Sequence, residues 1–443
     1  MGVRRRLVNR CSIGPSLGVG VLVAFTWLVV AGCSGPEQPA TPDTTSAATE
    51  SGPTCEGLRQ DGCAIAGGYR YFVAGNAAAD SAVVIDLGGP GLALGSTALL
   101  DDFVAALPQA LVEEHRFLAF EEPWAYQPDA TPECADAAGD WLRASRDALS
   151  HSVEDVLLAA PSSLREACGP ELRRSGWSPS TYREAVAAAL DDQGVPLAGF
   201  IGASFGGARR LYLDDGLAPT WTILVDPAPP GGSLAELLRD RSDAARQALV
   251  VYCPTCTDER IEAAAAALDA NPVALEGRSF PVSGADLKSA IAVGAKQPPQ
   301  IQQGLAAAVS GTPLTTETLR TVAQTSDAAW GRFGTDGVAP SSLAYFSEVC
   351  AAYPGDPTYE PDASSASIAS TLATLHSPCI GADAGGLPSP AVQALCIVAH
   401  TGDIIAGPAT QRWLHAYPDA SAHELPPGPH GSPDLTGCWK EQT

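Results

Sequence analysis

The chain has 443 residues, of which 45% are hydrophobic and 17% charged. This composition is typical of a packed globular protein and excludes wholesale disorder, and the length allows one large domain with an insertion, or two domains. The formal net charge of −24 at pH 7 predicts a surface that repels phosphate backbones, so we expect no nucleic-acid partner.

The N-terminus has the features of an export signal. Its first ten residues carry four arginines and no acid, and an apolar run follows from Leu17 to Val30. This run is shorter than the roughly 20 residues that a membrane-spanning helix needs. After removal of residues 1–32 the chain has 22 basic and 50 acidic residues, which gives a net charge of −28.

The tetrapeptide VAGC, which ends at Cys33, resembles the bacterial lipoprotein signal. Cleavage would leave Cys33 as a lipidated first residue, so we expect an exported protein anchored by lipid on the outer face of the cell membrane. The alternative is an ordinary signal peptide with a cysteine nearby. Residues 33–54 are rich in Pro, Ser and Thr and predict a disordered tether.

Ten cysteines follow the signal and the lipid site. Their even number in an exported chain favours disulfides over metal ligation. Pairing of neighbours, which the sequence does not fix, gives Cys55–Cys63, Cys134–Cys168, Cys253–Cys256, Cys350–Cys379 and Cys396–Cys438. The CPTC segment at Cys253 has the spacing of a redox pair. It lacks a thioredoxin-like strand–motif–helix setting, so a structural bridge is the favoured interpretation.

Short apolar runs alternate with helical segments over the first half of the mature chain. We expect strands at 68–75, 81–87, 116–120, 195–204 and 220–227, and helices at 140–150 and 154–174. A further helix is predicted to begin at Thr181, with Glu184 completing a capping box. Alternation of this kind predicts an α/β fold with a mostly parallel central sheet covered on both faces.

The pattern changes at about residue 233, where only helical segments follow until about residue 325. The alternation resumes with a strand at 394–400, a helix at 411–416 and a strand from residue 422. We therefore expect the first part of an α/β core at 55–228, an inserted helical cap at 229–376 and the second part of the core at 377–443.

The segment Gly202-Ala203-Ser204-Phe205-Gly206 fits G-x-S-x-G between a predicted strand and a predicted helix. In this pattern the serine lies in a tight strand-to-helix turn, and side chains at the two glycines would clash with neighbouring backbone. Ser204 is therefore the candidate nucleophile, and the N–H of Phe205 is a candidate donor to a developing oxyanion.

A second glycine-rich segment, LGGPG at 87–91, follows the predicted strand 81–87. Acyl transfer needs a second oxyanion donor from a loop after an early strand, and Gly89 is the candidate. A dinucleotide-binding loop is the alternative, but the spacing of the glycines misses G-x-G-x-x-G and Pro90 interrupts it. A simple turn is the remaining alternative.

A serine nucleophile requires a base and an orienting acid, in the chain order serine, acid, histidine. Asp403 directly follows a predicted strand, and His430 lies in a loop after the last one. Asp226 is the second candidate for the acid and Asp383 the third. The other candidate histidines lie in strand-like or helical runs and are expected to be structural: His400, His415 and His423.

LGGPG, GASFG, TGDIIAGP and PGPHG, in this order, resemble the proline iminopeptidase and tripeptidyl aminopeptidase family of α/β-hydrolases, and particularly its secreted actinobacterial members. The resemblance covers most of the mature chain. It implies an α/β-hydrolase fold with a helical cap, a triad of Ser204, Asp403 and His430, and an oxyanion loop at Gly89. It also implies a serine peptidase of the aminopeptidase type.

One segment departs from that family. The peptidases usually carry Asp-x-Arg-Gly where this chain reads FEEPW at 120–124, so the surrounding loop must be built differently. Glu121 or Glu122 is a candidate for binding a substrate's amino group, although solvated surface acids are the favoured interpretation. No HExxH or P-loop occurs, and we expect no cofactor and no metal site.

Three functions stay open from the sequence: a peptidase acting near an N-terminus, an esterase or lipase-like hydrolase on the same fold, and a surface lipoprotein without turnover. The expected partners are a small peptide or ester substrate and the membrane, through the lipid anchor. The oligomeric state is not determined by the sequence.

Overall fold

The computed structural model describes most of the chain beyond residue 52. The described residues are 53–58, 62–95, 98–126, 130–151, 156–213, 216–278, 280–294, 297–311, 313–330, 340–355, 366–382, 385–401, 403, 406–426, 430–435 and 437–439. The predicted signal, Cys33, nearly all of the tether and Asp383 lie outside these residues. Within them, no helix combines the length and the apolar character needed to cross a bilayer.

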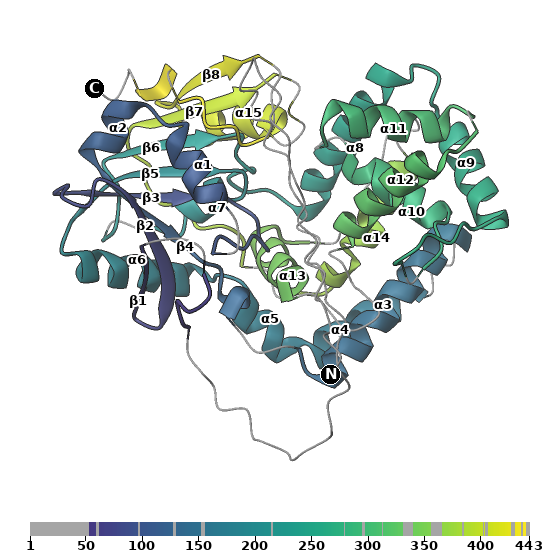
Figure 1. Ribbon diagram of the computed structural model, residues 1–443, viewed down its shortest axis with the longest axis horizontal. Helices are drawn as coiled ribbons and strands as arrows, with labels where there is room; N and C mark the ends of the chain where they lie inside the picture. The colour runs from purple at the N-terminus through teal and green to yellow at the C-terminus, as the bar shows by residue number, and fades with distance from the viewer. Residues whose placement is uncertain are drawn as a thin grey trace, which may run out of the picture.

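The described part of the chain forms one eight-stranded sheet, which organises the fold (Figure 1). Its strands are β1 (Cys63–Ala66), β2 (Tyr69–Gly75), β3 (Ala82–Asp86), β4 (Arg116–Phe120), β5 (Leu197–Ala203), β6 (Trp221–Val225), β7 (Leu395–His400) and β8 (Ser421–Leu425). They lie in the order β1-β2-β4-β3-β5-β6-β7-β8, and only the β1–β2 and β2–β4 pairs are antiparallel. The predicted α/β class with a mostly parallel sheet is confirmed.

Helices cover both faces of the sheet because the central strands are apolar on both sides. On β3, Ala82 and Val84 belong to one core, whereas Val83 and Ile85 belong to the other. The first core also contains side chains of α6 (Pro179–Gln193) and α15 (Ala406–Ala416). The second contains side chains of α1 (Leu99–Ala105) and α2 (Gln109–Glu114). The nearly all apolar strand predicted at 81–87 is thus buried between two helical layers.

A second, helical body lies beside the sheet (Figure 1). Its helices are α3 (Pro132–His151), α4 (Val156–Ala167), α5 (Gly169–Ser175), α8 (Leu234–Tyr252), α9 (Asp258–Ala270), α10 (Gly284–Gly294), α11 (Pro299–Val309), α12 (Thr316–Ala329), α13 (Pro340–Ala352) and α14 (Ala366–Leu375). The short 3-10 helices are η1 (Pro123–Tyr126) and η2 (Ser377–Cys379). One hydrophobic core joins Trp141 and Leu142 of α3 to Leu237 of α8 and Leu343 of α13.

Several predicted boundaries differ from the structure. The helix expected at 154–174 is interrupted at Cys168, the N-cap of α5. The helix expected to start at Thr181 begins at Pro179, because the Ser178 side chain accepts the Thr181 N–H and forms the capping box there. The four-residue edge strand β1 was not predicted.

All five predicted disulfides are present. Cys253–Cys256 closes the C-terminal end of α8, where Cys253 is the C-cap. Cys396–Cys438 joins β7 to the C-terminal segment. The neighbour pairing is therefore confirmed, and the CPTC segment forms an intrachain bridge.

Candidate active site

Ser204 lies in a strained turn between β5 and α7 (Gly206–Arg210). Its φ is +53°, a left-handed value that is uncommon for a residue with a side chain. The Ser204 N–H donates to the Val225 carbonyl at 3.0 Å, and its own carbonyl accepts the Ala228 N–H at 2.8 Å. These bonds fix the turn to β6, and the geometry is that of the strand–turn–helix that presents a nucleophilic serine.

The two glycines of the motif are required by close backbone approaches. A Cβ on Gly202 would lie 2.9 Å from the carbonyl carbon of Gly206, and a Cβ on Gly206 would overlap the backbone of Asp86. The predicted reason for these glycines, a clash of any side chain with neighbouring backbone, is confirmed.

The loop after β3, residues 88–91, passes directly beside the Ser204 turn, and we call it the glycine loop. A Cβ on Gly88 would lie 3.0 Å from the Phe205 nitrogen and 2.9 Å from Cβ of Ser204. Gly88, Gly89 and Gly91 all have positive φ, between +80° and +122°, which favours glycine. The structure therefore brings Gly89 and Phe205 to the same small region next to Ser204.

Asp403 and His430 form a buried pair. The Nδ1 atom of His430 lies 2.7 Å from Oδ2 of Asp403, and the two side chains are 7% and 6% exposed. With Nδ1 as the donor, Nε2 is left as an acceptor, and this buried atom has no hydrogen-bond partner among the described residues. A Cβ on the adjacent Gly431 would lie 3.7 Å from Cβ of Ala203, so the His430 loop contacts the end of β5.

Asp226, the second candidate for the acid, makes different contacts. It is fully buried with φ +44°, and Oδ1 accepts the His400 N–H at 2.8 Å. Its Oδ2 lies 2.7 Å from both the Gly431 nitrogen and Nδ1 of His400. The hydrogen bond to Asp226 raises the pKa of His400, against the effect of burial. Asp226 thus connects β6 and β7 to the loop that carries His430.

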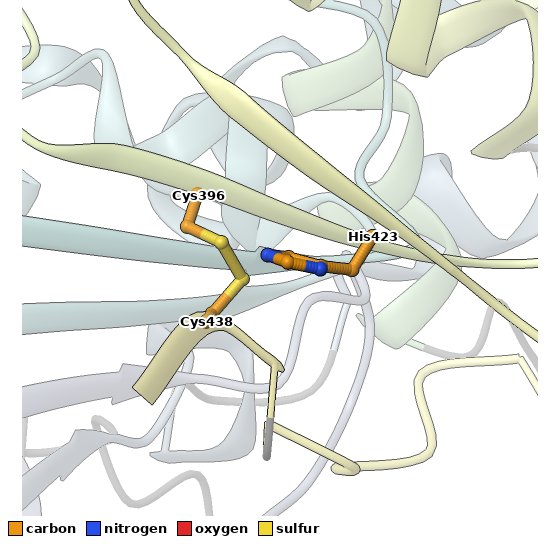
Figure 2. Close-up of side chains that lie close together, drawn as sticks. All are labelled: Cys396, His423 and Cys438. Atoms are coloured by element: carbon orange, nitrogen blue, oxygen red, sulfur yellow. A yellow bond between two sulfur atoms is a disulfide. The ribbon is translucent and has the colours of Figure 1, made fainter. Parts of the chain in front are cut away.

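Among the residues that the structure describes, two clusters have the donor types of a metal site. Asp226, Asp403 and His430 place one ligand atom each within 4.8 Å of one another, and all three side chains take part in the hydrogen bonds described above. Figure 2 shows the other cluster, in which His423 lies against Cys396 and Cys438. Because those two sulfurs form a disulfide, they are not thiolate ligands.

Glu121 and Glu122 are buried, at 1% and 2% exposure, so their interpretation as solvated surface acids was wrong. Glu121 accepts the N–H groups of Leu94 and Gly95 at 2.7 and 2.8 Å. Glu122 accepts the Gly91 N–H at 2.5 Å and the Trp124 indole N–H at 2.9 Å. Burial raises the pKa of both carboxyls. The segment that departs from Asp-x-Arg-Gly therefore holds the loop after β3.

Sequence reasoning missed Arg209, which lies on α7 at 2% exposure. It forms ion pairs with Asp86, Glu122 and Glu348 at 3.2, 2.6 and 2.8 Å. Burial opposes the charge on the guanidinium, but the three carboxylates raise its pKa well above the usual value. Burial in turn raises the pKa of Glu348 to about 7. The sequence offered one signal of a buried charge cluster: the adjacent acids Glu121 and Glu122 directly follow an apolar strand.

Five predicted site residues follow the carboxyl ends of parallel strands in this sheet, where ligands bind in parallel sheets. Gly89 follows β3, Ser204 and Phe205 follow β5, Asp403 follows β7 and His430 follows β8. The sheet order, the serine turn and the glycine loop define the α/β-hydrolase fold.

No protein-family model matches the sequence, and no match is found among curated proteins. Among solved structures, the chain is similar to proline iminopeptidase of Mycobacterium smegmatis, at 12% identity and a TM-score of 0.39, over 86% of this chain and 94% of that one.

A proline iminopeptidase-related protein from Thermus thermophilus gives 12% identity and a TM-score of 0.38 over 86% and 94% of the chains. An enol-lactonase from Burkholderia xenovorans gives 14% identity and a TM-score of 0.34, over 86% of this chain and 96% of that one.

Proposed function

We propose that this protein is a serine hydrolase in which Ser204 is the nucleophile, His430 the general base and Asp403 the orienting acid. The observation that carries the proposal is the Asp403–His430 hydrogen bond of 2.7 Å, which leaves a buried, unpartnered Nε2 in a loop that contacts the end of β5. An imidazole oriented in this way is suited to accept a proton from a serine hydroxyl.

The reaction proceeds through an acyl-enzyme. The Ser204 hydroxyl proton passes to Nε2 of His430 as Oγ bonds to the substrate's carbonyl carbon, and the carbonyl oxygen becomes an oxyanion bound by the N–H groups of Phe205 and Gly89. When this intermediate collapses, the leaving group departs with the proton from His430 and the acyl group stays on Ser204. Water, deprotonated by His430, then releases the acid by the same two steps.

The proposed substrate is a small peptide cleaved near its N-terminus, so that the enzyme is aminopeptidase-like. The support is the order of LGGPG, GASFG, TGDIIAGP and PGPHG, which resembles the iminopeptidase family. An ester is the alternative substrate, because a Ser-His-Asp triad acts on both amides and esters. The burial of Glu121 and Glu122 removes them as binders of a substrate's amino group.

A side-by-side substrate panel tests the proposal. We expect the wild-type protein to hydrolyse aminoacyl or tripeptidyl anilides, and Ser204→Ala to lose this activity. Hydrolysis of short acyl esters alone would assign the protein to the esterases. Absence of turnover on every substrate, with no reaction with a fluorophosphonate, would support a surface lipoprotein without catalysis.

The proposed location is the outer face of the cell membrane, with Cys33 as the lipid anchor. The export pattern of residues 1–32 and the five disulfides support an oxidising compartment. We expect globomycin to block processing of the precursor in a bacterial host. Processing that is insensitive to globomycin would indicate an ordinary signal peptide.

A further inference from the structure

We infer that Arg209 is a positioning residue that holds the glycine loop beside Ser204 through the carboxylates of Asp86 and Glu122. The inference rests on the proposed function, because this loop carries the proposed oxyanion donor Gly89. Arg209 does not contact the substrate in this account. It acts through two acids that hydrogen-bond to the loop backbone.

Both ends of the glycine loop are held by buried carboxylates. Oδ1 of Asp86 accepts the Gly88 N–H at 2.9 Å, and Oε2 of Glu122 accepts the Gly91 N–H at 2.5 Å. Gly89 lies between these two anchored positions. The placement of its N–H group therefore depends on the positions of Asp86 and Glu122.

One guanidinium connects the two anchors. Nη1 of Arg209 lies 3.2 Å from Oδ1 of Asp86, and Nη2 lies 2.6 Å from Oε1 of Glu122. Nη1 also donates to the Gly88 carbonyl at 3.4 Å, and the guanidinium lies 5.6 Å from the centre of the Phe205 ring. A planar fork can bind two carboxylates at once, which the point charge of a lysine cannot reproduce.

A third carboxylate holds Arg209 itself. Glu348 on α13 binds Nε and Nη2 of Arg209 at 2.8 and 2.9 Å, and it accepts the Trp177 N–H at 3.0 Å. Glu348 therefore connects the guanidinium to the helical body, whereas Asp86 and Glu122 connect it to the glycine loop.

Removal of the guanidinium would leave its acidic partners without a counter-charge. Asp86, Glu122 and Glu348 are 7%, 2% and 1% exposed, so water cannot replace Arg209 at low cost. Proton uptake or displacement of the loop would relieve the repulsion. A displacement of about 1 Å at a catalytic group can lower the rate about 100-fold.

The test is Arg209→Lys, which keeps the positive charge and removes the fork. We would measure the second-order rate of labelling by a fluorophosphonate probe, together with kcat and KM for p-nitrophenyl acetate, per folded molecule. We expect the labelling rate and kcat to fall about 100-fold with little change in KM, because the loop acts on the transition state. A wild-type kcat in Arg209→Lys would overturn the inference.

One control variant separates positioning from general destabilisation. Arg146→Lys removes a comparable fork from the helical body, where Arg146 binds Asp286 through two contacts of 2.7 Å. This variant is expected to lower Tm and keep the wild-type kcat. An equal loss of kcat in Arg146→Lys would assign the effect to stability and overturn the inference.

If the Arg209→Lys variant does not fold, the Glu122→Gln variant is used for the test. This change removes the charge of one anchor and is expected to lower kcat with little change in KM, whereas an unchanged kcat overturns the inference. The proposed function fails separately: it fails if the wild type is not labelled, or if Ser204→Ala is labelled equally. A labelled wild type together with a fully active Arg209→Lys contradicts only the positioning role.

Discussion

Replacement of Asp403 by asparagine changes which nitrogen of His430 carries the proton. In the wild type, Oδ2 of Asp403 lies 2.7 Å from Nδ1 of His430, and both side chains are buried. An asparagine of the same shape can present its amide N–H to Nδ1, which moves the imidazole proton to Nε2. In the proposed mechanism, Nε2 can then no longer accept the proton of Ser204.

The expected loss in kcat is about 10⁴-fold, by analogy with the serine-protease triad, in which the same change produces the wrong tautomer. That factor corresponds to about 5 kcal/mol of transition-state stabilisation. The assay is steady-state hydrolysis of an anilide or ester substrate per folded molecule. Thermal unfolding is measured alongside, because the size-conserving change is expected to alter activity far more than stability.

Asp226→Asn is the matched comparison. Asp226 accepts the backbone N–H groups of His400 and Gly431, so an amide in its place loses an acceptor inside a buried network. We expect about 1–3 kcal/mol of destabilisation and a smaller effect on kcat. Turnover of Asp403→Asn within tenfold of the wild type, combined with its loss in Asp226→Asn, would refute the reasoning and identify Asp226 as the acid.

Three further predictions concern stability. Replacing Cys396 and Cys438 by alanine should lower the free energy of unfolding by about 2–4 kcal/mol in denaturant titrations, and an unchanged midpoint would contradict a stabilising role. Gly202→Ala should reduce Tm sharply, because its Cβ would meet the Gly206 carbonyl, and a wild-type Tm would show that the turn adapts. Burial raises the pKa of Glu348 from 4.5 to about 7, so its contribution to stability falls as pH rises across that interval. Glu348→Gln should flatten this part of the pH–stability curve, and an unchanged slope would contradict the shift.

The sheet was predictable because its central strands are apolar runs bounded by turns. The segments at 81–87 and 116–120 contain β3 and β4, whose described side chains are almost all buried. β1 was missed because its four residues lie at the sheet edge and are only partly buried. The start of α6 was misplaced because two overlapping cap patterns, at Ser178 and at Thr181, compete within four residues.

The placement of Asp403 and His430 followed from one topological rule. Residues directly after parallel strands meet at the same sheet edge, so an acid after β7 and a histidine after β8 were expected to lie near Ser204. The structure places the acid and the histidine in contact. Their catalytic roles stay predictions.

The pairing of Arg209 with its three acidic partners could not be predicted from the sequence. Its contacts to Glu122 and Glu348 join residues 87 and 139 positions apart, and no local periodicity relates them. The acids were read as solvated because charged residues are rarely buried unless they are paired. The partner is Arg209, which reaches Glu122 and Glu348 because α7 lies between the glycine loop and α13 in the folded chain.

The most direct test of the central claim is to locate the adduct after reaction of the wild-type protein with a fluorophosphonate. Peptide mass mapping is predicted to place a single phosphonyl group on Ser204, and Ser204→Ala is predicted to remain unlabelled with an unchanged Tm. An adduct on another residue, or equal labelling of the two proteins, would contradict the assignment of Ser204 as the nucleophile.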